Sequence, residues 1–527
     1  MRFTFFVLFI IVINSVINPF KSLGQEGTTL ELIENHNEWG WDSWVMKNGL
    51  ITVSTVPEIG AKIMQFDLGN HSSMFVNPDE IGNTPTPSSG SSWPNFGGFK
   101  NWPAPQSEWN WPPPPILDFG SYEHEATYIT HDSVSLEVIS PVEQWRTPNL
   151  QFKRNTTIYK NSSRVKVDQT IINVADDVQE WSIWDVTQHI TNHPGKTDFE
   201  NFKVYFPINP ESRYGSDGVR VSAASSAWLG EVADGIFGVQ FLPESKKIFA
   251  DSHLGWIAYV DEQEGYIYAK TFDIDESGNY PDEGARVEVW INADPLYLEV
   301  EVLSPIISLP PNGGTYTFTE NWWAAKINSD PILSVNAVGA VTHFGYSPDL
   351  ERLSGSFGVF HNAFARLEYL DNTGTIIEST DTVKVTPLNM FEYNEPFSIS
   401  EDVDSVRMVL VDADLNKIGV LVSESVQVLT TNTEISSNLP SDFKLNQNYP
   451  NPFNPSTLIS YSIPKASDVQ LNIFNIIGQP VANLVNERKQ SGSYTVEFSA
   501  DNLPSGVYFY SIKAGTFTKT NKMLLIK

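Results

Sequence analysis

The sequence predicts an all-β protein, with a large sandwich of antiparallel sheets followed by two small β-sandwich domains. Apolar residues alternate with polar ones in short runs such as 165–171 and 287–291, which is the two-residue period of a strand with one buried face. Turn residues separate these runs, and no long helical period competes with them. With 527 residues, the chain is too long for one core, so we expect several domains.

Composition excludes several classes of function. The formal net charge is −30, from 63 acidic and 33 basic residues, which argues against a nucleic-acid partner because phosphates require a basic surface. The chain has no cysteine, so thiolate catalysis, thiolate zinc sites and disulfides are excluded. Residues 273–280 place oxygens at alternate positions as a calcium loop does, but position twelve is Gly284. We interpret this segment as a polar turn and expect no metal and no cofactor.

The N-terminus is typical of an exported protein. Arg2 precedes an apolar run over residues 5–17, and Ser22, Leu23 and Gly24 offer a cleavage region. This pattern predicts a signal peptide over residues 1–24. The apolar run is short for a membrane span, and we expect no transmembrane segment in the mature chain.

The remaining chain divides by composition and strand pattern. Residues 25–330 read as one long β-unit, because strand-like runs follow one another throughout. Residues 331–428 have the size of an immunoglobulin-like β-sandwich, with strands expected at 364–370 and 405–411. A polar linker is expected over residues 429–442.

The most specific motifs lie near the C-terminus, in residues 443–527. Prolines and asparagines at 448–455 predict a turn-rich entry, and Gly478 and Gly506 predict tight turns between short strands. This segment resembles the C-terminal sorting domain of the type IX secretion system of the Bacteroidetes. The resemblance implies an interaction with that secretion machinery and a final location outside the cell or on its surface.

Residues 93–115 combine tryptophan and proline to an unusual degree. Because proline lacks an amide donor, we expect a long, semi-rigid loop and neither a helix nor a central strand. Indole faces held on such a loop suit stacking against a sugar ring, although single tryptophans are more often core residues. The candidate substrate-binding residues in this loop are Lys100, Trp102, Gln106, Trp109 and Trp111.

Three parts of residues 30–325 carry a further set of motifs. They are residues 49–68, the run W-D-V-T-Q-H-I-T-N at 184–192, and the run D-P-L-Y-L-E-V-E-V at 294–302 together with residues 309–314 and 320–323. In this order they resemble the galactose mutarotase-like superfamily. The resemblance implies a large β-supersandwich that binds carbohydrate. Gly97-Gly98, Lys100 and Trp102 are similar to a bacterial subgroup of unassigned function, DUF4380.

The resemblance also implies catalytic roles. By motif, Glu299 corresponds to the base that deprotonates the anomeric hydroxyl, and His189 to the acid that protonates the ring oxygen. Glu301 lies two residues from Glu299 and should share its strand face, and Trp322 is added as a binding residue. The epimerases carry a further histidine where this chain has Asn95 before the two glycines, and His124 or His131 could replace it.

From these features we expect an exported carbohydrate-binding protein that is either sugar epimerase-like or glycan-processing. The alternative is a non-catalytic surface adhesin or structural protein, in which the β-domains are spacers and the tryptophans are core. The first hypothesis requires His189, Glu299 and the indoles to meet in one pocket. Histidine and carboxylate at a single sugar would then supply acid and base.

Overall fold

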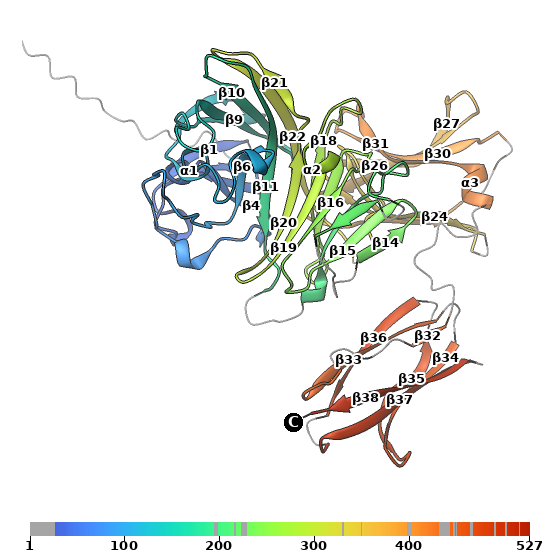
Figure 1. Ribbon diagram of the computed structural model, residues 1–527. Coiled ribbons are helices and arrows are strands. Elements are labelled where there is room, and N and C mark those ends of the chain that lie inside the picture. Colours follow the sequence, from blue (N-terminus) through green and yellow to red (C-terminus); the bar gives the residue numbers. More distant parts are fainter. Residues whose placement is uncertain are drawn as a thin grey trace, which may run out of the picture. The chain divides into compact units, whose positions relative to one another are not determined.

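The computed structural model is built almost entirely of β-strands, as predicted (Figure 1). It describes residues 27–193, 199–215, 218–222, 229–328, 331–348, 350–397, 400, 402–431, 443–445, 448, 451–463, 467–489, 492–500, 503–515 and 517–526. The predicted signal peptide and most of the predicted linker lie outside these residues. The chain separates into two compact units, Met1–Val428 and Leu429–Lys527.

The first of two large sheets carries the site described below. Its strands, in spatial order, are β1 (Thr29–Ile33), β2 (Ser43–Lys47), β3 (Ile51–Val56), β4 (Lys62–Leu68), β6 (Phe99–Ala104), β11 (Gln179–His189), β20 (Leu296–Leu303), β19 (Val287–Ala293), β16 (Lys246–Ala250) and β13 (Val219–Val221), with β5 (His71–Ser72) on β4 and β21 (Ile307–Leu309) on β11. Neighbouring strands pair antiparallel.

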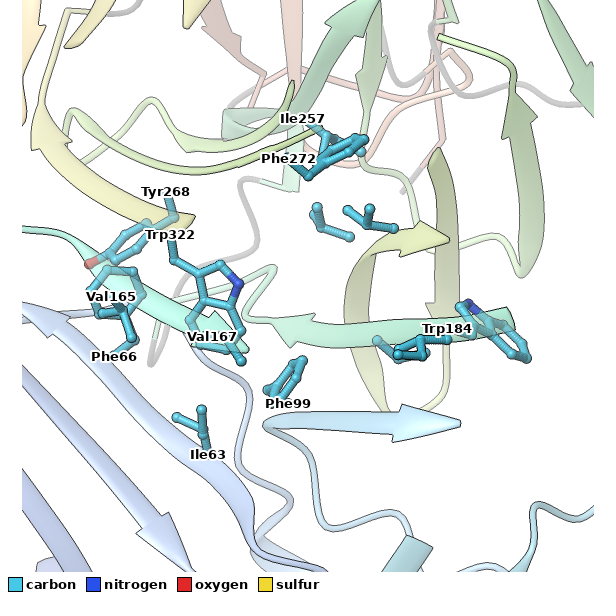
Figure 2. Close-up of a cluster of buried hydrophobic side chains, with 14 of the residues drawn as sticks. Ile63, Phe66, Phe99, Val165, Val167, Trp184, Ile257, Tyr268, Phe272 and Trp322 are labelled. Atoms are coloured by element: carbon cyan, nitrogen blue, oxygen red, sulfur yellow. The ribbon is translucent and has the colours of Figure 1, made fainter. Parts of the chain in front are cut away.

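The second sheet packs against one face of the first. Its order is β14 (Leu229–Ala233), β15 (Ile236–Gln240), β12 (Phe202–Pro207), β17 (Trp256–Asp261), β18 (Tyr266–Phe272), β22 (Gly314–Lys326), β10 (Val165–Asn173), β9 (Leu150–Tyr159), β8 (Ser133–Ile139) and β7 (Glu123–Ile129). Phe99 of the first sheet meets Trp322 of the second, with ring centroids 4.7 Å apart. Figure 2 shows these two rings within the buried cluster between the sheets.

The prediction of one long loop over residues 93–115 is wrong in its middle. Residues Phe99–Ala104 form strand β6, which lies between β4 and β11. Strand β4 pairs with β6 only at Ile63 and Phe99, so Pro103 lies beyond the paired part of that edge. A proline is tolerated there because no amide donor is needed on the unpaired side.

Short helices and turns flank these strands. They are η1 (His36–Glu38), η2 (Pro57–Ile59), η3 (Pro78–Glu80), η4 (Gln106–Glu108), α1 (Pro115–Phe119), η5 (Phe199–Asn201) and α2 (Pro281–Gly284). Outside β6, residues 93–115 contain only η4 and the first residue of α1 as helical structure, and the remainder is irregular.

The rest of the first unit forms two smaller sheets. One contains β23 (Ser334–Val335), β24 (Gly339–Ser347), β25 (Arg352–Val359) and β29 (Phe391–Pro396), and the other β27 (Ile376–Ser379), β26 (Ala363–Leu370), β30 (Ser405–Val411) and β31 (Lys417–Ser425), with β28 (Val383–Val385) on β26. Helix α3 (Val426–Thr431) follows. Trp323 of β22 stacks on Phe360 with centroids 5.1 Å apart, so this module shares a buried cluster with the large sandwich.

The second unit is a small sandwich with its own core. Its sheets contain β32 (Lys444–Leu445), β33 (Ser456–Ile463) and β36 (Gly492–Ser499), and β35 (Pro480–Lys489), β34 (Ser467–Asn475), β37 (Gly506–Ala514) and β38 (Phe517–Leu525). Across the described residues, we find no helix with the length and apolar character of a membrane span.

Candidate functional site

The outer face of the first sheet, turned away from the second sheet, carries a group of charged and aromatic side chains. Strand alternation places Trp184, Val186 and Gln188 of β11 on this face. Their direct partners across the ladder are Trp102 and Lys100 on β6, and Glu301 and Glu299 on β20. The same rows continue through Glu288 and Trp290 on β19 to Phe249 and Lys247 on β16.

A cavity of about 480 Å³ opens over these rows. Its walls and floor are Trp93, Trp102, Gln106, Trp111, Trp184, Lys247, Phe249, Asp282, Glu288, Trp290, Asn292, Tyr297 and Glu299. The volume lies within the range of roughly 300–1,000 Å³ that is usual for small-molecule sites. Mostly aromatic walls with a few buried charges are also typical of such sites.

Five of the described tryptophans line this cavity, and four of them pack edge to face. Trp102 stands at the centre, with ring centroids 5.2 Å from Trp184 and 6.0 Å from Trp93, and Trp93 meets Trp111 at 5.0 Å. The Trp102 Nε1–H donates to Asp118 at 2.8 Å, and the Trp184 Nε1–H to Glu301 at 2.6 Å. These bonds fix both ring planes, so the indole faces are preorganised for a flat ligand.

A glycine pair sets where Lys100 and Trp102 enter the sheet. Gly97 and Gly98 have φ of +94° and +61°, in the left-handed region. A Cβ on Gly97 would lie 2.1 Å from the Phe75 carbonyl oxygen, and one on Gly98 2.5 Å from that of Ile63. Only glycine permits this close backbone approach.

Glu299 occupies the floor of the cavity beside Lys100. Its Oε1 accepts a hydrogen bond from Gln188 at 2.8 Å and lies 3.7 Å from the Lys100 Nζ. Burial raises the pKa of Glu299 to about 7, against the lowering effect of Lys100, and Glu301 adds to the rise. Burial also lowers the pKa of Lys100, which Glu299 opposes. A carboxyl group that titrates near neutrality can donate or accept a proton.

Lys247 lines the cavity beside Glu288. Its Nζ lies 2.8 Å from Glu288 and also contacts Glu301. Burial tends to lower the pKa of Lys247, but Glu288, Glu301 and Glu299 outweigh it and leave the pKa raised. Burial raises the pKa of Glu288 to about 8, opposed by Lys247. Lys100 and Lys247 are therefore the ion-pair partners of three buried glutamates, Glu288, Glu299 and Glu301.

The structure separates His189 from Glu299. His189 pairs with Leu298 across β11 and β20, one residue out of step with Glu299, so its ring lies on the opposite face of the sheet. It stacks on Tyr259 of the second sheet with centroids 4.3 Å apart. Burial, with a contribution from Lys270, lowers the pKa of His189 to about 3. The expected meeting of the two side chains in one pocket is therefore wrong.

Two other predicted binding residues lie away from the cavity. Trp109 is 4% exposed behind Trp102, and its Nε1–H donates to the Pro103 carbonyl at 2.8 Å. Trp322 belongs to the core between the sheets, where its Nε1–H donates to Glu320 at 3.1 Å. In both cases a buried neighbour satisfies the indole N–H, and local sequence gives no sign of that. Neither ring lines the cavity.

The other predicted residues reach the site. Trp102, Gln106, Trp111 and Glu299 line the cavity. Lys100 and Glu301 lie immediately behind it, and Glu301 shares the strand face of Glu299, as the two-residue spacing indicates.

Sequence reasoning missed the cavity residues that come from the strands, namely Trp184, Lys247, Phe249, Glu288, Trp290, Asn292 and Tyr297, and it missed Asp282 of α2. The signal existed in part, because Glu288 and Trp290 stand at alternate positions of the strand predicted over residues 287–291.

The remaining histidine and acidic candidates lie elsewhere. His124 accepts a hydrogen bond from the Trp44 indole at 2.9 Å, and His131 is exposed beside Asp132. Asp275 accepts hydrogen bonds from the Ser277 amide and hydroxyl, as in a polar turn. Within the described ranges, no cluster of three histidine or acidic side chains has the arrangement of a metal site.

Residues 447–527 match the family model described as "Secretion system C-terminal sorting domain". The second unit is therefore a sorting domain of the type IX system, and the protein is exported to the medium or the cell surface of a Bacteroidetes-type bacterium. The same domain implies an interaction with the secretion machinery. No curated protein matches the chain.

Several solved structures are similar to part of this chain at low sequence identity. A galactose mutarotase-like protein from Clostridium acetobutylicum has 11% identity and a TM-score of 0.38, covering 57% of this chain and 98% of its own. One from Lactobacillus casei has 10% identity and a TM-score of 0.37, with coverage of 54% and 99%. A galactose mutarotase related enzyme from Lactobacillus acidophilus has 10% identity and a TM-score of 0.34, with coverage of 53% and 96%. These likenesses assign no activity to this chain.

Proposed function

We propose that this exported protein binds carbohydrate in the cavity on the outer face of its first sheet. The single observation that carries the proposal is the aromatic cavity itself, in which Trp93, Trp102, Trp111, Trp184 and Trp290 surround buried carboxyl groups. Indole faces stack on the C–H face of a sugar ring. The carboxyl groups of Glu288 and Glu299 and the ammonium of Lys247 line the cavity, so they can accept hydrogen bonds from the sugar hydroxyl groups and donate hydrogen bonds to them.

Trp111 provides the most accessible platform, because 54% of its surface is exposed while its ring contacts Trp93. Gln106 lies on the adjacent turn η4 and offers an amide that both donates and accepts. A sugar bound here would be covered by aromatic rings on several sides and would meet Glu299 below. This arrangement is usual for a specific site rather than for a spacer domain.

A second proposal is that the site acts on the sugar that it binds. It is supported by Glu299, whose pKa of about 7 suits a general acid or base at neutral pH. Glu288 on the neighbouring strand supplies a second carboxyl group with a raised pKa. Epimerase-type chemistry would have to proceed without His189, since that ring faces the second sheet.

The test is a titration of the full chain with sugars, in which intrinsic tryptophan fluorescence reports binding. Glucose, galactose, N-acetylglucosamine and their oligomers are screened first, and ligands that bind are incubated and analysed for changed anomers or cleaved products. The full chain is required because Trp323 at the end of the large sandwich packs on Phe360 of the next module.

Glu299→Gln then separates binding from turnover. We expect it to retain binding within a few-fold and to lose at least 100-fold in turnover, because general acid–base catalysis contributes roughly 10²–10⁴-fold. Glu34→Gln, an exposed carboxylate after β1 at the far edge of the same sheet, is the matched control. Binding without turnover in the unaltered protein supports the alternative of a non-catalytic adhesin, and absence of any sugar binding refutes the main proposal.

A further inference from the structure

Among the described residues around the cavity, carboxyl groups outnumber basic groups. The carboxyl groups of Glu288, Glu299, Glu301 and Asp282 line or underlie it, whereas Lys100 and Lys247 are the cations at the floor. Asp282 stands at the rim, where its carboxyl interacts with that of Glu288.

Arg220 also reaches the rim, but it has its own partner. Its Nε lies 4.0 Å from Glu283, and its Nη2 donates to the Asp282 carbonyl oxygen at 3.4 Å. Its guanidinium stacks on Phe249, 3.8 Å from the ring centroid. Counting this pair leaves the excess of two carboxyl groups unchanged.

Glu288 gives a second, independent sign of a missing partner. Its side chain is 1% exposed and lines the cavity, while its Oε1 has no hydrogen-bond partner within the described chain. A buried carboxyl oxygen without a partner is costly. The natural complement is a ligand donor that reaches the cavity floor.

We infer that the cavity is selective for a sugar that carries a protonated amino group. The inference rests on the proposed function and names the class of sugar. Glu288 shares Lys247 with Glu301, so an ammonium group would add a second cation beside Glu288 and Asp282. It would also bring N–H donors to the free Oε1 of Glu288. The surrounding indole faces attract a cation as well.

The two lysines do not already fill this role. Lys100 lies behind Trp93 and Trp102, with its Nζ 5.7 and 5.4 Å from their ring centroids, and its nearest carboxylate is Glu299. Lys247 is shared between Glu288 and Glu301. For the same reason, a uronic acid would add a carboxylate to an acidic cavity and should bind poorly.

The test compares glucosamine, glucose, N-acetylglucosamine and glucuronate by calorimetric titration of the full chain at neutral pH, with cyclohexylamine as an amine without sugar hydroxyls. We expect glucosamine to bind about tenfold or more tighter than glucose, as for a hydrogen bond that involves a charged group, here the ammonium. N-acetylglucosamine should lose that gain, because its nitrogen is uncharged. Cyclohexylamine should bind more weakly than glucosamine, since it lacks the hydroxyl groups.

Glu288→Gln should abolish the preference for glucosamine over glucose, whereas Glu283→Gln, which is next to Asp282 but does not line the cavity, should preserve it. If Glu288→Gln fails to fold, Asp282→Asn at the exposed rim should reduce the preference at least threefold.

Equal affinity for glucosamine and glucose overturns the inference and leaves sugar binding intact. Tighter binding of cyclohexylamine than of glucosamine overturns it in favour of a general amine site, and no binding of any sugar refutes the proposed function as well.

Discussion

Trp111→Ala and Trp109→Ala form a pair that tests whether the aromatic cavity binds sugar. The two indoles are two residues apart, yet Trp111 is 54% exposed and lines the cavity, whereas Trp109 is 4% exposed behind it. We expect Trp111→Ala to weaken sugar binding with little effect on stability. Trp109→Ala should instead destabilise the fold.

The magnitudes follow from the exposed areas. An indole side chain has a surface of about 250 Å², so roughly 130 Å² of Trp111 faces solvent. A sugar that covers half of it removes about 65 Å² of apolar surface from water, worth about 1.6 kcal/mol at 25 cal/mol per Å². This corresponds to a loss of about tenfold in affinity. Removal of the buried Trp109 ring should cost about 3–5 kcal/mol in the free energy of unfolding.

Affinity is measured by isothermal titration calorimetry and stability by urea denaturation for both variants and the unaltered chain. The reasoning would be refuted by a Trp111→Ala variant that binds sugar as tightly as the unaltered chain. It would also be refuted by a folded Trp109→Ala variant that loses more affinity than Trp111→Ala does.

Two further predictions concern the floor and the entry of the site. The pKa of Glu299 rises from 4.5 to about 7 on folding, so between pH 4.5 and 7 the folded state binds more protons than the unfolded state. The free energy of unfolding therefore falls as pH rises from 4.5 to 7, by up to about 3 kcal/mol. Glu299→Gln should remove that share of the slope in urea denaturation from pH 4.5 to 7, and an unchanged slope would contradict the assignment. Gly97→Ala should lower the free energy of unfolding by about 2 kcal/mol or more, because its Cβ would meet the Phe75 carbonyl. The control Gly49→Ala, with a similar positive φ and open space around it, should lower it by only about 1 kcal/mol. Equal losses of stability in thermal unfolding would refute the close-approach argument.

The amino-acid sequence by itself was sufficient to predict the all-β architecture of this protein. The two-residue alternation of apolar side chains depends only on local strand geometry, so it predicted an all-β chain. The C-terminal motifs identified the sorting domain, because turn residues at fixed spacing are also a local property. The clustered tryptophans indicated a ligand-binding rim, and of the three predicted there, Trp102 and Trp111 line the cavity whereas Trp109 does not.

Tertiary structure decided which side chains meet. His189 and Glu299 lie on neighbouring strands, but the register between β11 and β20 pairs Glu299 with Gln188, and a shift of one residue places the histidine on the other face. Register depends on long-range pairing, which one strand's sequence does not specify. For the same reason Glu288, Trp290 and Lys247 could be assigned to the site only once β19 and β16 were seen beside β20. Burial then set the pKa values of the carboxyl groups, because desolvation depends on everything that surrounds a side chain.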